Sequence, residues 1–256
     1  MPRAGDGLRL LLLGGTAEAR ELAGRLAAAP EIRVVTSLAG RTRTPMLPAG
    51  ECRIGGFGGI DGLCDWLRCT GTGLVVDATH PFARRISAHA LAACRRLGLP
   101  CLRLERPPWR PAAGDRWREV PSLERALEIL PASGRRVFAS VGREQIPRLA
   151  ERPECRFLLR AITPPAAVPA NVEVVTGRPP YTVAGDRSLL ARFAIDALLV
   201  RNSGGAGARP KLLAARELGL PVVMIARPPP LPGNRVTSVE AAVEAVLAYS
   251  RGRAEW

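Results

Sequence analysis

The chain is poor in lysine and aromatic residues. Lys211 is its only lysine among 37 Lys and Arg residues, and the arginines are spread along all 256 positions. The formal net charge is +14, yet no block of five or more basic residues occurs and aromatic residues make up only 4%. Nucleic-acid surfaces combine clustered basic residues with aromatic side chains that stack on bases. The sequence therefore argues against nucleic acid as a partner, and its dispersed positive charge favours an anionic small molecule.

Metal-ligand patterns and long apolar runs are also missing. The six cysteines include no CxxC pair, and His80 and His89 are not at zinc-helix spacing, so we expect neither a metal site nor a disulfide framework. The apolar run from Leu10 to Leu13 follows Arg9 directly and is too short for a signal peptide. No stretch approaches the length of a membrane span, so we expect a cytoplasmic protein with no membrane partner.

Short apolar runs bounded by glycine or proline alternate with segments of helical period, which predicts parallel sheets built from βαβ units. Helices are expected after Thr16 as an N-cap, from Asp61, and from about Ala83 to Leu97 with Gly98 ending the last of these. The predicted strands are Leu8 to Leu13, Ile32 to Ser37, Leu74 to Ala78, Cys101 to Leu104, Arg136 to Ser140, Arg156 to Ala161, Val172 to Val175, Ala197 to Arg201 and Val222 to Ala226.

An internal similarity suggests two domains. "RRLGLPCLRLERPP" at 95–108 aligns with "RELGLPVVMIARPP" at 216–229, and "LVVDATH" at 74–80 corresponds to "LLVRNSG" at 198–204. The alternative is that Leu-Gly-Leu-Pro is only the usual end of a helix before a strand. A true repeat predicts two Rossmann-like α/β domains with parallel sheets flanking a central cleft. We expect an N-terminal domain over 1–112 that binds a cofactor and a C-terminal domain over 113–256 on the substrate side, with the boundary near the stretch from Pro107 to Trp117.

The loop "GGTAEA" after the first strand is the first candidate for binding. Gly14 and Gly15 would allow close approach of a ligand to the backbone, at a helix start that offers free N–H groups. The spacing is not that of G-x-G-x-x-G, so the loop alone is a weak signal. We expect Glu18 to cap its helix or orient a neighbour and not to contact a phosphate, since an acid in the first helical turn is favoured by the helix dipole whatever the function.

The end of the second predicted strand, "VVTSLAGRTRT", bears on the choice of cofactor. NAD-binding folds usually place an acid here for the ribose, whereas NADP-binding folds use hydroxyl groups and arginine around the extra phosphate. This segment has Ser37, Arg41 and Arg43 and no acid, which favours NADPH. The alternative is that arginine near a loop is common in so arginine-rich a chain.

Further loops after predicted strands carry glycine, hydroxyl or basic side chains. "RIGGFGG" at 53–59 is either a wall against a cofactor or a flexible connection, and "DATHPFA" at 77–83 places Thr79 and His80 where a nicotinamide or substrate would lie. An isolated histidine is more often structural than catalytic. In the second half, "VRNSGGAGARPKLL" at 200–213 includes Lys211, which could bind a carboxylate; the alternative is turn chemistry with solvated charge.

Together, "LGGTAEAREL", "TSLAGRT", "RIGGFGG", "VVDATHPFA", "VGREQI" and "VRNSGGAGARPKLLAARELGLPVVMIARP" resemble the precorrin-6A reductases of cobalamin biosynthesis, in the same order from about residue 9 to 245. The resemblance implies two Rossmann-like domains and an NADPH-dependent reduction of one double bond of the precorrin-6A macrocycle, giving precorrin-6B. It also implies a polycarboxylate tetrapyrrole as substrate, with neighbouring enzymes of the pathway as candidate partners for transfer of intermediates.

The resemblance implies site residues where the motifs match. The cofactor side comprises Gly15, Thr16, Ser37, Arg41, Gly55, Gly56, Thr79, His80 and Pro81. The substrate side comprises Tyr181, Arg201, Asn202, Ser203, Gly204, Gly205 and Lys211. The catalytic residue is not identified, and His80, Ser203 and Lys211 are its candidates. Relatives commonly have lysine where this chain has Arg201, which keeps the charge but does not readily lose a proton.

Three other functions stay open. The substrate of the anaerobic pathway, cobalt-precorrin-6A, is an alternative to the metal-free compound. Another NADP-dependent reductase is possible, although neither Tyr181 nor Tyr249 is followed by lysine at the Tyr-x-x-x-Lys spacing of short-chain enzymes. A binding or regulatory protein would bind its ligand without turnover.

Overall fold

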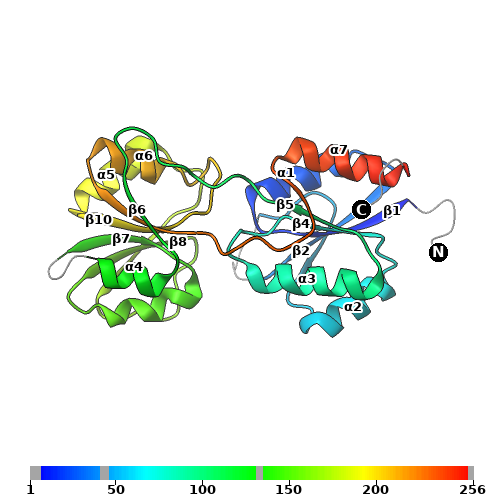
Figure 1. Ribbon diagram of the computed structural model, residues 1–256, viewed down its shortest axis with the longest axis horizontal. Coiled ribbons are helices and arrows are strands. Elements are labelled where there is room, and N and C mark those ends of the chain that lie inside the picture. The colour runs from blue at the N-terminus through cyan, green and yellow to red at the C-terminus, as the bar shows by residue number, and fades with distance from the viewer. Residues whose placement is uncertain (1–6, 41–45, 131–134, 253–256) are drawn as a thin grey trace. The chain divides into compact units, whose positions relative to one another are not determined.

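The computed structural model describes residues 7–40, 46–130 and 135–252, and the chain divides into two compact units, each containing one six-stranded sheet whose paired strands are all parallel (Figure 1). Unit 1 combines the chain up to Arg106 with the chain from Pro229 onward, and unit 2 is Pro107–Pro228. Arg41 and Arg43 lie outside the described residues.

The sheet of unit 1 has the strand order β12-β5-β4-β1-β2-β3. Its strands are β1 (Leu8–Leu13), β2 (Ile32–Leu38), β3 (Glu51–Ile54), β4 (Leu74–Asp77), β5 (Cys101–Leu104) and β12 (Asn234–Val236). Counting β12 as a sixth strand, this is the 3-2-1-4-5-6 order of the Rossmann fold. The order reverses between β1 and β4, and ligands of open α/β sheets bind beyond the carboxyl ends of the strands at that point.

Two pairs of helices cover the sheet of unit 1 on opposite faces (Figure 1). They are α1 (Ala17–Leu26) with α7 (Val239–Ser250) on one face and α2 (Gly59–Cys69) with α3 (Arg84–Leu97) on the other. The alternate leucines of β1 pack on both sides, Leu10 and Leu12 toward α1 and α7, Leu11 and Leu13 toward α2 and α3. This explains why β1 is apolar throughout, as expected for a strand buried on both faces.

Unit 2 repeats the same topology with the order β6-β11-β10-β7-β8-β9. Its strands are β6 (Arg116–Val120), β7 (Arg136–Ser140), β8 (Arg156–Ala161), β9 (Val172–Thr176), β10 (Ala197–Arg201) and β11 (Pro221–Ile225). Its helices are α4 (Leu123–Ile129), the 3-10 helix η1 (Arg143–Glu151), α5 (Val183–Arg192) and α6 (Pro210–Glu217), with α5 and α6 on one face and α4 on the other (Figure 1). Here the order reverses between β7 and β10, which corresponds to β1 and β4.

The structure confirms the internal repeat. The similar segments form the fourth strand of each sheet, β4 and β10, and the fifth strand of each, β5 and β11. After each fifth strand comes Arg-Pro-Pro, and there the chain passes to the other unit: β5 is followed by β6 of unit 2, and β11 by β12 of unit 1. The outermost strand beside β5 in unit 1 is therefore β12, which follows β11 of unit 2 in the chain. The outermost strand beside β11 in unit 2 is β6, which follows β5 of unit 1.

The division expected from the sequence, 1–112 and 113–256, differs from the observed one at the C-terminal end. Residues from Pro229 onward belong to unit 1, because β12 pairs in parallel with β5 and because Val239, Ala242 and Val246 of α7 lie in the core beneath α1. The first crossing, at Pro107, lies at the start of the stretch expected for the boundary.

All nine predicted strands are present, with ends that match or shift by one residue, and three strands were not predicted: β3, β6 and β12. All three lie at sheet edges. Edge strands are short and carry charged side chains that discourage further pairing, so they lack the apolar run on which the prediction depends. In β6, for example, Arg116, Arg118 and Glu119 are exposed.

Candidate functional site

The loop after β1 uses its two glycines for different reasons. A Cβ on Gly14 would lie 2.9 Å from Cγ2 of Thr36 and 3.3 Å from Cδ2 of Leu38, so this position packs tightly against β2. Gly15 has φ +108°, a conformation that other residues rarely adopt, and a Cβ there would meet nothing within 4 Å. The backbone at Gly15 is therefore open to a ligand at the point where the strand order reverses.

Thr16 fastens the start of α1 to the end of β4. Its Oγ1 accepts a hydrogen bond from the backbone N–H of Ala19 at 3.1 Å, which makes Thr16 the predicted N-cap. The same hydroxyl donates to the carbonyl oxygen of Ala78 at 2.8 Å. With both functions of the hydroxyl used inside the protein, Thr16 shapes the candidate cofactor site and offers a ligand its backbone rather than its side chain.

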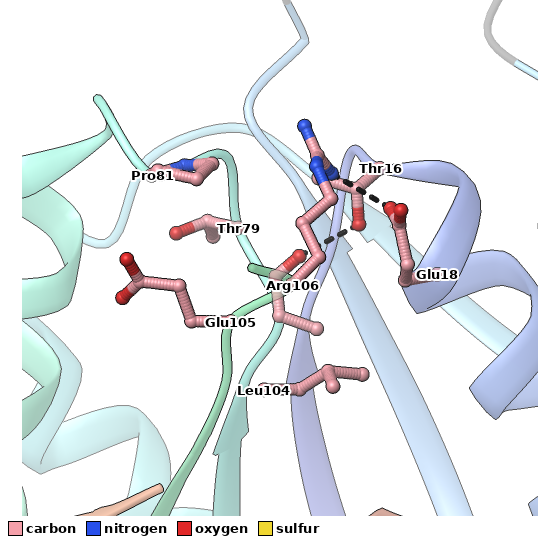
Figure 2. Close-up of a pocket in the computed structure, with 8 residues that line it drawn as sticks. Thr16, Glu18, Thr79, Pro81, Leu104, Glu105 and Arg106 are labelled. Atoms are coloured by element: carbon pink, nitrogen blue, oxygen red, sulfur yellow. Dashed lines mark hydrogen bonds and ion pairs between the residues drawn. The ribbon is translucent and has the colours of Figure 1, made fainter. Parts of the chain in front are cut away.

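A small pocket lies at the carboxyl ends of β1, β4 and β5 (Figure 2). Its lining residues are Thr16, Glu18, Ala78, Thr79, Pro81, Leu104, Glu105 and Arg106. Nη1 of Arg106 donates to Glu18 at 2.7 Å, and Figure 2 shows the Arg106 side chain reaching toward Glu18 while the Glu105 carboxylate points away. Glu18 thus orients a neighbour, as expected, whereas the capping role belongs to Thr16. Whether Glu18 avoids a bound phosphate stays a prediction.

A buried polar network holds the loop after β4. Oδ1 of Asp77 accepts hydrogen bonds from the N–H of Thr79 at 3.0 Å and from its hydroxyl at 2.7 Å. Oδ2 of Asp77 pairs with Arg103 of β5, whose Nε donates to Glu105 at 2.8 Å and whose Nη1 donates to Ser87 at 2.8 Å. Arg103 has its pKa raised, since the charges of Asp77 and Glu105 outweigh the effect of its burial. The hydroxyl of Thr79 is therefore committed to Asp77, and the loop is fixed from behind.

His80 is the next residue along this loop. Its Nδ1 accepts a hydrogen bond from the N–H of Phe82 at 3.2 Å, and its ring lies 5.8 Å from that of Phe82. In the neutral ring this bond leaves the hydrogen on Nε2. Pro81 is buried and lines the pocket. The structure thus brings Thr79 and Pro81 to the pocket wall together with Thr16, and their contact with a cofactor stays a prediction.

The ends of β2 and β3 form a second part of the same edge. Ser37 and Arg53 are partners in the parallel ladder, and Nη1 of Arg53 donates to Oγ of Ser37 at 2.9 Å. Arg53 also donates to the carbonyl oxygens of Gly55 at 3.1 Å and Gly56 at 2.9 Å, and its guanidinium lies 3.8 Å from the ring centre of Phe57. Ser37, Gly55 and Gly56 are therefore gathered around one arginine.

In unit 2, Lys211 is buried at 3% exposure. Its Nζ donates to the carbonyl oxygen of Ala208 at 2.6 Å and lies 4.9 Å from the ring centre of Trp109. Burial, followed by the charge of Arg160, lowers the pKa of Lys211 to about 7, with Asp186 opposing and Arg201 adding to the shift. This lysine therefore titrates near neutrality inside the protein.

Tyr181 is part of a buried charged cluster. Arg160 of β8 pairs with Asp186 of α5, and the side chains of this ion pair are 8% and 3% exposed. The guanidinium of Arg160 lies 3.6 Å from the ring centre of Tyr181 and 5.0 Å from that of Phe138. The hydroxyl of Tyr181 donates to the carbonyl oxygen of Gly177 at 3.0 Å, and burial raises its pKa.

The loop after β10 is anchored to both chain crossings. Oδ1 and Nδ2 of Asn202 bond to the backbone N–H and carbonyl oxygen of Trp109 at 2.8 and 3.0 Å, so both side-chain atoms are used within unit 2. Arg227 donates to the carbonyl oxygens of Asn202, Ser203 and Pro107 at 2.8, 3.0 and 3.2 Å. Gly204 and Gly205 have positive φ, and Nη1 of Arg201 lies 3.7 Å from Oε1 of Glu144.

Sequence reasoning did not identify three arginines of unit 1: Arg53, Arg103 and Arg106. Arg103 carried a usable signal, because a charged residue between Leu102 and Leu104 in a short apolar strand requires a buried partner. Arg53 begins the quoted "RIGGFGG" segment, but its position beside Ser37 follows only once β3 is recognised as a strand. Arg106 had no signal besides its place in the repeat, where it corresponds to Arg227.

Within residues 7–40, 46–130 and 135–252, no group of three or more His, Cys, Asp and Glu side chains is arranged to hold a metal ion. Among the same described residues, no helix is long and apolar enough to cross a membrane.

Sequence comparison with known proteins shows the family of this chain. The sequence model of the family described as "Precorrin-6x reductase CbiJ/CobK" matches residues 9–247. The chain belongs to this precorrin reductase family. A precorrin-6A reductase of Rhodococcus erythropolis is 44% identical over 245 residues, which cover 95% of this chain and 99% of that relative. A cobalt-precorrin-6A reductase of Priestia megaterium is 27% identical and covers 94% of this chain and 99% of its own length.

A solved structure titled "CobK precorrin-6A reductase" has a TM-score of 0.89 and 42% identity, covering 95% of this chain and 97% of that one. As a precorrin reductase, this protein therefore has the fold that the resemblance implies. The roles of the two sets of site residues are proposals. What the structure adds is their grouping: the described residues of the cofactor set lie in unit 1, and all of the substrate set lie in unit 2.

Proposed function

We propose that this protein is an NADPH-dependent precorrin-6A reductase, which transfers a hydride to one double bond of the macrocycle and gives precorrin-6B. The observation that carries the proposal is the similarity to the solved precorrin-6A reductase along nearly the whole chain, at 42% identity and a TM-score of 0.89. The metal-free substrate is favoured over the cobalt complex because a relative named for the former is 44% identical and one named for the latter 27%.

The residues of unit 1 fit a dinucleotide. Its strand order is that of dinucleotide-binding folds, and an added Cβ at Gly15, Gly55 or Gly56 would meet nothing within 4 Å, so the backbone along this edge is open. The α1 N-terminus supplies free backbone N–H groups for a pyrophosphate beside Gly15. The end of β2 presents Ser37 and no acid, which fits a phosphorylated ribose better than a free one.

When bound, NADPH supplies the hydride, and the protein supplies position and electrostatics. Thr16 ties the start of α1 to Ala78, so the two strand ends on either side of the crevice keep a fixed spacing. Asp77 fixes the backbone at Thr79 and thereby places His80 and Pro81. Arg106 keeps a positive charge at the pocket, with Glu18 holding it in place.

The substrate is expected on unit 2. Its acetate and propionate groups make it a polyanion, and Arg201 adds positive charge at the loop after β10. Reduction of the conjugated imine-like system also needs one proton. His80, Ser203 and Lys211 stay the candidates for its delivery, and Nζ of Lys211 is set apart by a pKa of about 7.

An anaerobic assay of the purified chain with precorrin-6A and NADPH tests the proposal. We expect loss of cofactor absorbance together with a product two hydrogens heavier than the substrate. The cobalt complex and small ketones are run in parallel. Faster turnover of the cobalt complex would favour the anaerobic pathway, turnover only of ketones would favour another reductase, and tight binding without turnover would favour a binding protein.

A further inference from the structure

Arg53 stands out among the arginines of unit 1 because its surroundings hold it in one orientation at the carboxyl end of β3. Nη1 bonds to Oγ of Ser37 and to the carbonyl oxygen of Gly55, Nη2 bonds to the carbonyl oxygen of Gly56, and the guanidinium lies on the ring of Phe57. A side chain with free rotation would gain little from a ligand, since ordering it costs conformational entropy. The contacts of Arg53 within the protein already order its side chain, so a ligand binds without that entropy cost.

The same contacts leave part of the guanidinium unused. An arginine has five N–H donors. Both N–H groups of Nη1 have an acceptor, Ser37 and Gly55, and one N–H of Nη2 has an acceptor, Gly56. The N–H of Nε and the second N–H of Nη2 have no acceptor among the described residues. Nε and Nη2 form the edge of a guanidinium that binds two oxygens of one phosphate side by side. Arg53 therefore presents a pair of donors suited to a phosphate.

Ser37 contributes a third donor beside this pair. Its Oγ accepts from Arg53 at 2.9 Å, so its own hydrogen is directed elsewhere, and it has no acceptor among the described residues. Ser37 ends the segment of β2 where a Rossmann fold meets the adenosine ribose of its cofactor. No acidic side chain occurs in the described part of the segment from Thr36 to Gly40. Three donors beside a strand end that carries no acid favour an anion on that ribose.

There is also room for the ligand. Gly55 has φ +120°, and an added Cβ at Gly55 or Gly56 would meet nothing within 4 Å. The turn that accepts the bonds of Arg53 is thus open on its outer side, so a ribose phosphate can approach the backbone closely.

We propose that Arg53, together with Ser37, binds the 2′-phosphate of the adenosine ribose and so selects NADPH over NADH. This inference rests on the proposed function, because it assigns a part of the same cofactor site. It adds a residue that sequence reasoning placed only in a glycine-rich turn, and it gives Phe57 the role of supporting the arginine from one side.

Calorimetric titration of the full chain without substrate tests the assignment through binding rather than turnover. The probes are adenosine 2′,5′-bisphosphate and 5′-AMP, which differ only in the 2′-phosphate, followed by NADP⁺ and NAD⁺. The wild type should bind the bisphosphate at least about tenfold more tightly than 5′-AMP. Arg53→Gln should weaken the bisphosphate about 10- to 100-fold and change 5′-AMP less than about threefold.

Arg68→Gln is the matched control. Arg68 lies on α2 in the same unit with its side chain 56% exposed, so its replacement removes the same charge without touching this edge, and both affinities should stay as in the wild type. If Arg53→Gln does not fold, Arg53→Lys takes its place, because lysine keeps the charge but loses the paired donors. This variant should lose most of the preference for the bisphosphate over 5′-AMP, and Ser37→Ala should lose part of it.

The outcomes separate this inference from the proposed cofactor. A wild type that prefers the 2′-phosphate, with an Arg53 variant that prefers it equally, overturns the role of Arg53 and leaves NADPH in place. An Arg53 variant that loses both probes to the same extent shows a purely structural arginine and also overturns it. A wild type that binds NAD⁺ as tightly as NADP⁺, or neither, refutes the proposed cofactor and this inference together.

Discussion

Replacing Lys211 by methionine should change how the stability of the protein depends on pH. Methionine has nearly the same length and no charge, so it fits the space between Ala208 and Trp109 while removing the titrating group. In the folded protein the pKa of Lys211 is lowered to about 7, chiefly by burial, whereas in the unfolded chain it is close to the usual value of about 10.4. Between these two pH values the unfolded chain holds a proton that the folded protein has released.

The sign follows from that difference in bound protons. A state that binds more protons is favoured as pH falls, so the free energy of unfolding rises with pH in this window. For a folded pKa of about 7, the gain between pH 7 and pH 9 is about 2 kcal/mol. The methionine variant lacks this gain. It also loses the bond to Ala208, but that cost does not depend on pH.

The measurement is urea unfolding at pH 7 and pH 9, together with hydrogen exchange of amides in β10 to report on unit 2. The wild type minus Lys211→Met difference should grow by about 2 kcal/mol toward pH 9. Lys211→Arg is the matched control: it keeps a charge that cannot be lost, so it should be destabilised at both pH values and show no added slope. Parallel pH dependences of wild type and methionine variant would refute the reasoning.

Three further predictions concern packing, charge and capping. Gly14→Ala should lower the free energy of unfolding by about 1–3 kcal/mol in thermal or urea unfolding, because the new Cβ meets side chains of β2. Gly24→Ala, on the open side of α1, should raise it by about 0.5–1 kcal/mol. Equal effects of the two substitutions would contradict the packing argument. Asp186→Asn should cost about 3–5 kcal/mol by leaving a buried arginine uncompensated, and a loss below about 1 kcal/mol would show that water reaches the pair. Thr16→Ala should lose about 1–2 kcal/mol and raise KM for NADPH, while Thr16→Ser should retain both, and a failure of serine to do so would assign the effect to the lost methyl group.

The central strands and the repeat were predictable because burial on both faces forces an apolar run, as in β1 and β10. Three of the edge strands, β3, β6 and β12, were not predictable, because they have a solvent-exposed side and no such run. The course of the chain after Ile225 was also beyond sequence reasoning. Pairing of β12 with β5 is a contact between distant segments, and a three-residue strand leaves almost no local pattern.

For the site, loop glycines and hydroxyl residues were predictable because parallel strands bring their carboxyl ends to one edge. The side chains that hold these loops were harder to find. Arg53 and Arg103 act through partners on neighbouring strands, Ser37 and Asp77, so their roles depend on the register of the sheet. Likewise, the burial of Lys211 against Trp109 joins residues far apart in the chain.

The reciprocal placement of the sixth strands also sets the order in which the two halves can mature during synthesis. Unit 2 is one continuous segment, so all its strands are available once Pro228 has left the ribosome. Unit 1 has five strands long before that, yet it lacks β12 and the core residues of α7. The half that is translated first is therefore the half that finishes last. Until then it carries an unpaired edge on β5 and an uncovered apolar face beside α1, the kind of surface that a chaperone would shield.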